Sequence, residues 1–252
     1  AGNERSLAGM EISSLYQDRQ GLLWVGSEDG GLSRYDAASD SFIRYQYDPS
    51  RPDGLSDNHV YSIVEDREGV LWVGTAAGGL NALDRQNGSF RSYRADPDDL
   101  LSLSSDAVRC VFEDSQGNLW VGTETGAVVL DGQSWTPLTA ATSGLPGDRV
   151  LALAVEPSSG GDRVWFGTGA GVSRFDTATG EWTSFPEAFD PAWSGVAELA
   201  FDSTGRLWAG TAGGGLGRWD GTAWTFYRTS NSDIPFNTVN VIAEVKRRSP
   251  SR

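Results

Sequence analysis

The chain has 252 residues, a formal net charge of −14 at pH 7 and 38% hydrophobic residues, with a sequence isoelectric point near 4.4. An acidic surface repels phosphate backbones and anionic lipids, so we expect neither nucleic acid nor a membrane surface as a partner. The length allows a large core, in one β domain or two smaller domains.

No apolar run approaches the 18 residues of a transmembrane helix. The first residues, Ala1 to Arg5, do not resemble a signal peptide, although one could have been removed. Cys110 is the single cysteine and lies in an apolar stretch, so we interpret it as a buried structural thiol.

In chain order, one pattern recurs. Its first copy predicts strands at Glu11–Gln17, Leu22–Ser27, Gly31–Tyr35 and Ser41–Tyr45, joined by short turns rich in Gly and acids. The first strand ends near an acid, the second carries Trp followed by Gly, and the fourth is aromatic. Four short strands at this spacing predict an antiparallel meander.

The second strand of this pattern occurs five times, and each Trp follows the previous one after 43–48 residues. A period of this length is typical of solenoids and propellers. The copies are Leu23–Ser27, Leu71–Thr75, Leu119–Thr123, Val164–Thr168 and Leu207–Thr211.

We therefore predict an all-β fold, a β-propeller of four-stranded antiparallel blades with five complete blades and one extra C-terminal strand. A single meander cannot bury its own faces, whereas twisted meanders stack face to face around an axis. The Trp would fill the wedge between adjacent blades, and the Gly after it would allow close approach. The predicted segments are a lead-in at 1–8, blades at about 9–47, 58–94, 107–138, 149–185 and 195–228, an extra strand at 238–245, and a disordered basic tail at 246–252.

The run from Asp66 to Thr75, followed by Gly78-Gly79-Leu80, resembles the repeat of the two-component regulator propeller family. It is also similar to repeats of streptogramin-lyase-like propellers. The resemblance extends from about Met10 to Val245 and implies a bacterial sensor domain, periplasmic or extracellular, that binds small molecules, often glycan fragments, in signal transduction. The chain differs from the family in carrying no transmembrane segment, no kinase part and fewer blades than usual.

An Asp-x-x-Gly-x-x-Trp pattern precedes four of the Trp strands and resembles the Asp-box of sialidases. A carboxylate at this position accepts backbone N–H groups across the hairpin. We therefore interpret Asp18, Asp66, Asp114 and Asp202 as structural rather than catalytic.

Residues that break the repeat are the better candidates for function, because repeated positions build the scaffold. The loops before the first strands and those between the second and third strands should share one face, and long loops on a rigid scaffold commonly bind ligands. The ligand-binding candidates on this rim are Glu28, Asp29, Asp57, His59, Tyr61, Asp106, Arg109, Glu124, Arg149, Trp193 and Asn240.

Each candidate also has a structural interpretation. We interpret His59 as a solvated turn residue rather than as a catalytic base. For Arg109 we favour an ion pair with Asp106 or Glu124 over contact with a ligand. Trp193 could stack on a sugar ring or cap a blade edge. Asp57 and Asp106 fit turn chemistry.

The sequence predicts no catalytic set, no metal site and no cofactor. Three functions remain open: a non-enzymatic ligand- or partner-binding propeller, a lyase or glycosidase that uses rim acids and His59, and a protein-interaction scaffold. The extra strand could cover an open edge, or replace Glu11–Gln17 in the first blade. The chain could also be a fragment of a larger propeller, whose raw edges favour self-association.

Overall fold

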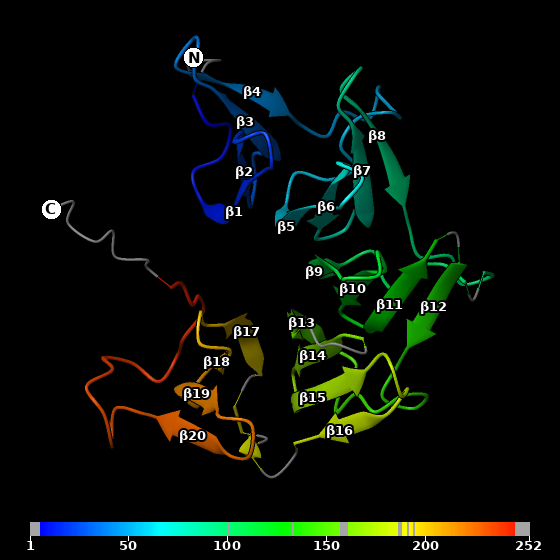
Figure 1. Ribbon diagram of the computed structural model, residues 1–252. Coiled ribbons are helices and arrows are strands. Elements are labelled where there is room, and N and C mark those ends of the chain that lie inside the picture. Colours follow the sequence, from blue (N-terminus) through cyan, green and yellow to red (C-terminus); the bar gives the residue numbers. More distant parts are fainter. Residues whose placement is uncertain are drawn as a thin grey trace, which may run out of the picture. The chain divides into compact units, whose positions relative to one another are not determined.

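The computed structural model describes residues 6–99, 101–132, 134–156, 161–185, 188–190, 192–193 and 195–244. The chain forms two compact units. The first runs to Ser143 and includes Asp148–Val150, and the second comprises Gly144–Gly147 and the chain from Leu151 onward. The described residues form twenty strands in five four-stranded sheets, which Figure 1 labels in chain order.

The first unit contains three four-stranded sheets. Their strands are β1 (Ile12–Gln17), β2 (Leu23–Ser27), β3 (Leu32–Asp36) and β4 (Ser41–Tyr45); β5 (Val60–Glu65), β6 (Leu71–Thr75), β7 (Leu80–Asp84) and β8 (Ser89–Tyr93); and β9 (Val108–Glu113), β10 (Leu119–Thr123), β11 (Gly126–Asp131) and β12 (Ser134–Leu138).

The second unit contains two further sheets. Their strands are β13 (Val150–Glu156), β14 (Arg163–Thr168), β15 (Gly171–Asp176) and β16 (Trp182–Ser184); and β17 (Val196–Phe201), β18 (Leu207–Thr211), β19 (Leu216–Trp219) and β20 (Trp224–Tyr227).

Every sheet pairs its strands in chain order, which confirms the predicted meander of four strands per blade. The predicted extra strand takes a different form. In its described part, 238–244, the structure has one isolated antiparallel bridge, between Thr238 and Ala212, and no continuous ladder. Val245, the predicted tail at 246–252 and the first five residues lie outside the described residues.

The Trp strands form the cores between neighbouring blades, as predicted. Trp24, Trp72, Trp120 and Trp165 are buried, the last with no exposed surface, and Trp208 is half-buried. In the first unit, Trp24 packs against residues of the second blade: Ile63, Leu71, Leu83 and Phe90. Trp72 and Trp165 pack in the same way with residues of the third and fifth blades, so within each unit an indole joins one blade to the next.

A carboxylate in the β5–β6 turn accepts hydrogen bonds from the turn backbone and from the indole of Trp72. Asp66 Oδ1 accepts the backbone N–H groups of Glu68 at 3.0 Å and Val70 at 2.8 Å. Asp66 Oδ2 accepts the indole N–H of Trp72 at 2.7 Å. The same three bonds recur in blades 1, 3 and 5, at Asp18, Asp114 and Asp202.

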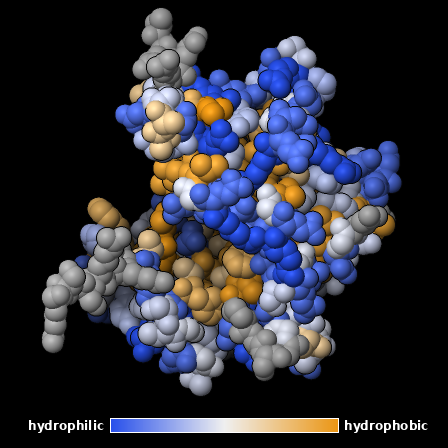
Figure 2. Space-filling model, turned by 45° about the horizontal axis from the view of Figure 1, so that its top comes forward, coloured by the Kyte–Doolittle hydropathy of each residue, from blue (hydrophilic) through white to orange (hydrophobic). Residues whose placement is uncertain are grey.

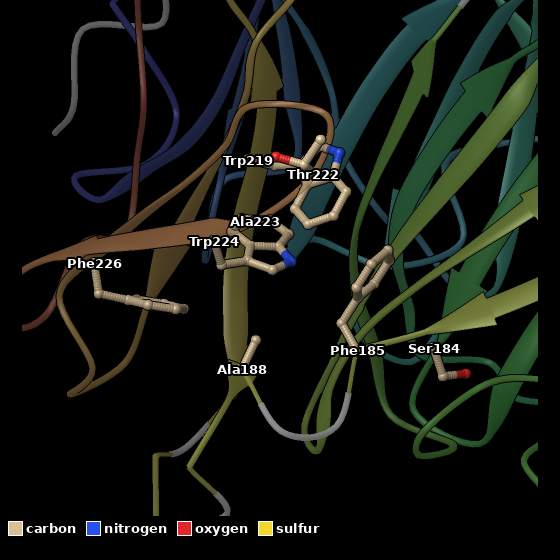
Figure 3. Close-up of a pocket in the computed structure, with 8 residues that line it drawn as sticks. All are labelled: Ser184, Phe185, Ala188, Trp219, Thr222, Ala223, Trp224 and Phe226. Atoms are coloured by element: carbon tan, nitrogen blue, oxygen red, sulfur yellow. The ribbon is translucent and has the colours of Figure 1, made fainter.

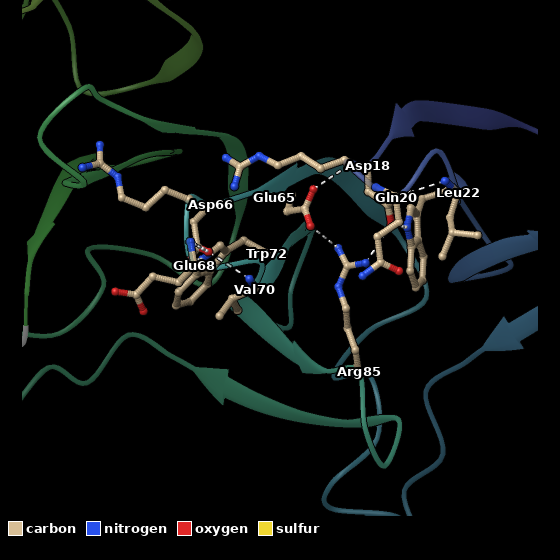
Figure 4. Close-up of polar contacts among 12 residues, drawn as sticks. Asp18, Gln20, Leu22, Glu65, Asp66, Glu68, Val70, Trp72 and Arg85 are labelled. Carbon is tan, nitrogen blue, oxygen red and sulfur yellow. Dashed lines mark hydrogen bonds and ion pairs between the residues drawn. The ribbon is translucent and has the colours of Figure 1, made fainter.

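The Asp18 turn is also linked to the second blade (Figure 4). Arg85 donates to Asp18 Oδ2 at 2.7 Å and to Glu65 Oε1 at 2.9 Å, and Glu65 Oε2 accepts the backbone N–H of Arg19 at 2.7 Å. Burial alone would raise the pKa of the Asp18 carboxyl, but the hydrogen bonds from Trp24, Arg85 and Leu22 outweigh it and the pKa is lowered. This network links the first blade to the second at their Asp turns.

A second link joins consecutive blades near the start of each first strand. The side chain of Asn58 accepts the backbone N–H of Tyr47 at 2.8 Å, and its backbone oxygen accepts the N–H of Gly31 at 2.8 Å. Asp106 repeats both bonds with Ala95 and Gly79, each at 2.8 Å. These two connections of the first unit are therefore fixed to the blade before them.

The Gly that follows each Trp allows the close approach predicted from the sequence. A Cβ added to Gly74 would lie 2.5 Å from Ser62 Oγ and 2.7 Å from Val108 Cγ1. Val108 is the first residue of β9, the first strand of the next blade. No real Cβ tolerates such distances, so a larger residue would push these strands apart.

Most of the surface drawn in Figure 2 is hydrophilic, in keeping with the formal charge of −14. Within the described ranges, no helix is long and apolar enough to cross a membrane.

We expect Asp66→Ala to lower the free energy of unfolding by about 2–4 kcal/mol, because two backbone N–H groups and a buried indole N–H lose their acceptor. Urea unfolding followed by far-UV circular dichroism measures the change. Glu68→Ala is the matched control, since Glu68 is an exposed carboxylate in the same turn. Equal effects of the two substitutions would contradict the structural role of Asp66.

Candidate functional site

The rim position that varies most between repeats is a β-bulge. In β5, Val60 pairs with Thr75 and Ser62 with Gly74, so Tyr61 has no partner across the ladder. Arg109 in β9 is skipped in the same way, as are the equivalent residues of β1 and β17. A bulge re-aims the side chain of the extra residue, and bulges are frequent next to functional sites. In these four blades the scaffold thus presents one side chain that is not restrained by a partner across the ladder.

Within the first unit, two bulge residues and their neighbours form a charged cluster. The Arg109 guanidinium lies 4.1 Å from the centre of the Tyr61 ring and pairs with Glu124, which follows β10. Arg149, just before β13, donates to the other Glu124 oxygen at 2.8 Å. Two guanidinium groups thus share one carboxylate, and the cluster carries a net positive charge in an acidic protein.

The cluster is partly open to solvent. The side chains of Arg109 and Glu124 are 26% and 28% exposed, and that of Arg149 is 47% exposed. Ion pairs at this exposure contribute about 0–1 kcal/mol to stability. The ion pairs of the cluster therefore contribute little to the stability of the fold, and its guanidinium groups are accessible to solvent.

His59 lies beside this cluster, in the turn before β5. Its ring centre is 4.4 Å from that of Tyr61, and its Nε2 is buried without a hydrogen-bond partner among the described residues. The prediction of a solvated side chain is therefore wrong for Nε2. An unpaired buried nitrogen is unusual and costs free energy.

Two of the predicted acids are turn residues, in agreement with their structural interpretation. Asp57 accepts the backbone N–H groups of His59 at 3.3 Å and Ala77 at 2.8 Å. Asp106 accepts from Arg94 at 3.0 Å, so Arg109 pairs with Glu124 rather than with Asp106.

The acids of the first blade lie apart from these contacts. Glu28 and Asp29 are exposed in the turn after β2. The hydrogen bond with Glu28 raises the pKa of the Glu11 carboxyl. Within the described residues, no group of three or more His, Cys, Asp or Glu side chains could hold a metal ion.

The remaining two candidates lie in the second unit. Trp193 packs against Phe226, with ring centres 5.3 Å apart, and the Arg228 guanidinium lies 4.9 Å from its ring. A Cβ on Gly214 would come within 2.3 Å of this indole. Trp193 is half-buried and packs against the fifth blade. Asn240 is exposed.

A pocket of about 680 Å³ in the second unit lies among aromatic side chains (Figure 3). Phe185, Trp219 and Trp224 surround it, and β16, β19 and β20 position them. The corresponding positions of blades 1 and 2 are Tyr45, Leu83 and Phe90, which pack in a core. These are blade-packing positions, so the pocket is a feature of the scaffold.

The sequence prediction missed Glu198, one residue beyond the bulge in β17. It faces Gly210 across the ladder, where Ser14, Ser62 and Cys110 face the equivalent glycines of other blades. Among the described residues its carboxylate has no hydrogen bond or ion pair, and burial raises its pKa to about 7. A Glu at a position otherwise held by small residues was the signal available in the sequence. Cys110 itself is half-buried rather than fully buried.

Five antiparallel meanders, each with a Trp in its second strand and four of them with a capping Asp, define a β-propeller. Within this class, the family model described as two component regulator propeller matches residues 6–29, 54–77 and 102–125. Each match covers an Asp turn and a Trp strand of the first unit. The resemblance predicted from the sequence is thereby confirmed at three blades.

Solved structures agree with this result. The extracellular domain of a hybrid two-component system from B. thetaiotaomicron is 26% identical over 89% of the chain, with a TM-score of 0.76. The extracellular domain of a one-component system from the same organism is 26% identical over 88%, with a TM-score of 0.69. The chain spans 31% of the length of each. This is a propeller related to extracellular domains of such systems.

Virginiamycin B lyase from Staphylococcus aureus shares the fold, at 16% identity over 91% of this chain and 73% of the lyase, with a TM-score of 0.65. No curated protein matches the chain.

The raised pKa of Glu198 predicts a pH dependence of stability. The folded state holds the proton up to about pH 7, whereas an unfolded Glu releases it near pH 4.3. Stability contributed by the protonated form is therefore lost as pH rises between these values. We expect Glu198→Gln to remove a loss of roughly 1–2 kcal/mol across this window, measured by urea unfolding at pH 4.5, 6 and 7.5.

Glu181→Gln, at an exposed glutamate between β15 and β16, is the matched control and should leave the slope unchanged. If Glu198→Gln also left it unchanged, the carboxylate would not be desolvated in solution.

Proposed function

We propose that the chain is a non-enzymatic ligand- or partner-binding β-propeller, a piece of the sensor domain of a bacterial two-component signalling protein that acts in the periplasm or outside the cell. The observation that carries the proposal is the cluster of Tyr61, Arg109, Glu124 and Arg149. Its residues occupy the variable bulge and loop positions of a scaffold whose other positions repeat.

The chemistry of the cluster suits recognition of an anionic group. A guanidinium offers planar, bidentate hydrogen bonds to carboxylate or sulfate, and a stacked ring holds it in place. Glu124 can release one Arg to an incoming anion while it keeps the other. An acidic glycan fragment or other small anion is the ligand that fits, and a protein partner would need an acidic side chain there.

Binding is favoured over catalysis because the carboxylate of the cluster is engaged by two guanidinium groups. A glycosidase needs two free carboxyl groups flanking the bond. A lyase would need His59 as a base with an accessible nitrogen, and His59 Nε2 is buried.

We expect isothermal titration calorimetry with a panel of neutral, carboxylated and sulfated glycan fragments to show heat with anionic members only. Arg109→Ala should weaken that binding about 10-fold or more, since a charge-assisted pair is worth about 1.5–3 kcal/mol. Arg109→Lys, which keeps the charge and loses the bidentate geometry, should give an intermediate affinity.

Arg51→Ala is the matched control, because Arg51 is an exposed arginine whose side chain lies 3.9 Å from Asp53 in a loop. Circular dichroism of each variant verifies folding. A panel without any heat, together with turnover of one member that Glu124→Gln or His59→Ala abolishes, would favour the enzyme instead. Binding that is indifferent to Arg109 would overturn the assignment of the site.

A further inference from the structure

The junction between the first and second blades holds a guanidinium group of the chain itself (Figure 4). Arg85, which follows β7, donates to Asp18 Oδ2 at 2.7 Å and to Glu65 Oε1 at 2.9 Å. Its guanidinium carbon also lies over the Trp24 ring, 5.8 Å from the ring centre. Two carboxylates and an indole therefore form a binding site for one guanidinium group.

The junction between the second and third blades repeats the carboxylates and the indole but not the arginine. The three equivalent residues are Asp66, Glu113 and Trp72. Gly132 directly follows β11, as Arg85 directly follows β7. The alignment is fixed by Leu130 and Leu83, two residues earlier, because each pairs with the Leu before the Trp of its own blade. The third blade thus lacks the side chain that occupies the first junction.

A pocket of about 470 Å³ lies at this second junction. Its charged lining residues are Asp66, Glu68, Glu113, Asp131 and Arg67. Four carboxylates and one guanidinium give the lining a formal net charge of −3. Trp72, Leu119 and Leu130 add an indole and two apolar side chains. A negatively charged pocket with an aromatic and apolar wall suits an organic cation.

Asp66 has acceptor capacity that its counterpart in the first blade uses. Asp18 Oδ2 accepts both the indole N–H of Trp24 and a guanidinium N–H of Arg85. Asp66 Oδ2 accepts only the indole N–H of Trp72 among the described residues, although a carboxylate oxygen can accept two hydrogen bonds. Asp66 is 9% exposed. A carboxylate at this depth is stabilised by a cation placed beside it.

Arg67 lies at the pocket but reaches only one of its two inner carboxylates. Its Nε donates to Glu113 Oε1 at 3.1 Å, and its Nη2 donates to the backbone oxygen of Asp114 at 2.7 Å. No contact joins it to the carboxylate of Asp66 among the described residues. Glu113 Oε1 can accept a second hydrogen bond, so Arg67 and a bound cation are compatible.

We propose that the pocket formed by Asp66, Glu113 and Trp72 binds a guanidinium group carried by another molecule, either a free alkylguanidine or an arginine side chain of a peptide. One N–H donates to Asp66 Oδ2, a second donates to Glu113 Oε1, and the group lies over the Trp72 ring. The first junction supplies the template, because Arg85 makes the same three contacts there.

This site is separate from the charged cluster at the rim. Glu113 is the last residue of β9, whereas Arg109 is its second, so the two sites lie at opposite ends of that strand. The ligands also differ in the sign of their charge. The guanidinium site therefore does not rest on the proposed function, and either assignment can fail without the other.

The test is isothermal titration calorimetry of the full chain with n-propylguanidinium, N-acetyl-arginine methylamide and N-acetyl-citrulline methylamide. We expect one site per chain for the two guanidinium compounds. The citrulline compound should bind at least tenfold more weakly, because its uncharged urea group loses two charge-assisted hydrogen bonds. The stronger of the two guanidinium ligands shows whether a free alkylguanidine or a peptide arginine fits the site better.

Glu113→Gln should weaken guanidinium binding about tenfold, because it removes one charge and keeps the shape of the side chain. Glu181→Gln, at an exposed glutamate of the fourth blade, is the matched control and should leave the affinity unchanged. Circular dichroism verifies that both variants fold. In nuclear magnetic resonance spectra of the unmodified chain, the ligand should shift the indole N–H signal of Trp72 and leave that of Trp208 in place.

The absence of heat with both guanidinium compounds would overturn the proposal. Equal affinity for the citrulline compound would also overturn it, because charge would then play no part. So would binding that is indifferent to Glu113→Gln and leaves the Trp72 signal unmoved, since the ligand would then lie elsewhere.

Discussion

The structure depends on one interaction, the hydrogen bond between a buried indole N–H and a carboxylate in the preceding turn. An indole large enough to fill the space between two sheets brings a polar N–H into the core, where leaving it unpaired costs about 1–3 kcal/mol. Asp66 supplies the acceptor for Trp72 and at the same time caps the turn that begins its strand. One side chain thereby couples local turn geometry to packing between blades.

This coupling separates structural positions from variable ones. Everything that touches the indole is restrained: the Asp, the glycine behind the Trp and the apolar residues of the next blade. The bulge residue of the first strand of a blade is free of those restraints, because it has no partner in the ladder. The residue at this position, Tyr61 in β5 and Arg109 in β9, can therefore differ from blade to blade without changing the pairing of the strands.

The repeated features were predictable from the sequence because the pattern that produces each of them occurs in several blades. The five blades, the burial of the Trp side chains and the capping role of Asp18, Asp66, Asp114 and Asp202 follow from periodicity and turn chemistry. Features that occur once were harder to predict. Whether Arg109 pairs with Asp106 or Glu124 depends on side-chain geometry across a bulge, which spacing does not encode.

Two other outcomes depended on surroundings supplied by distant residues. His59, whose Nε2 is buried, lies beside the ring of Tyr61, and the packing of Trp193 depends on the small size of Gly214. The ladder expected for 238–245 did not form in the described part, because a strand needs a neighbour as well as a suitable sequence.

The fourth blade shows that the acceptor need not come from the turn. It lacks the Asp, and Trp165 donates instead to Glu156, the last residue of β13, at 3.4 Å, while its indole stays buried. In this blade the acceptor and the donor thus come from two neighbouring strands of one sheet. A buried indole at this position therefore needs a carboxylate within reach, and a strand can supply that carboxylate as well as a turn.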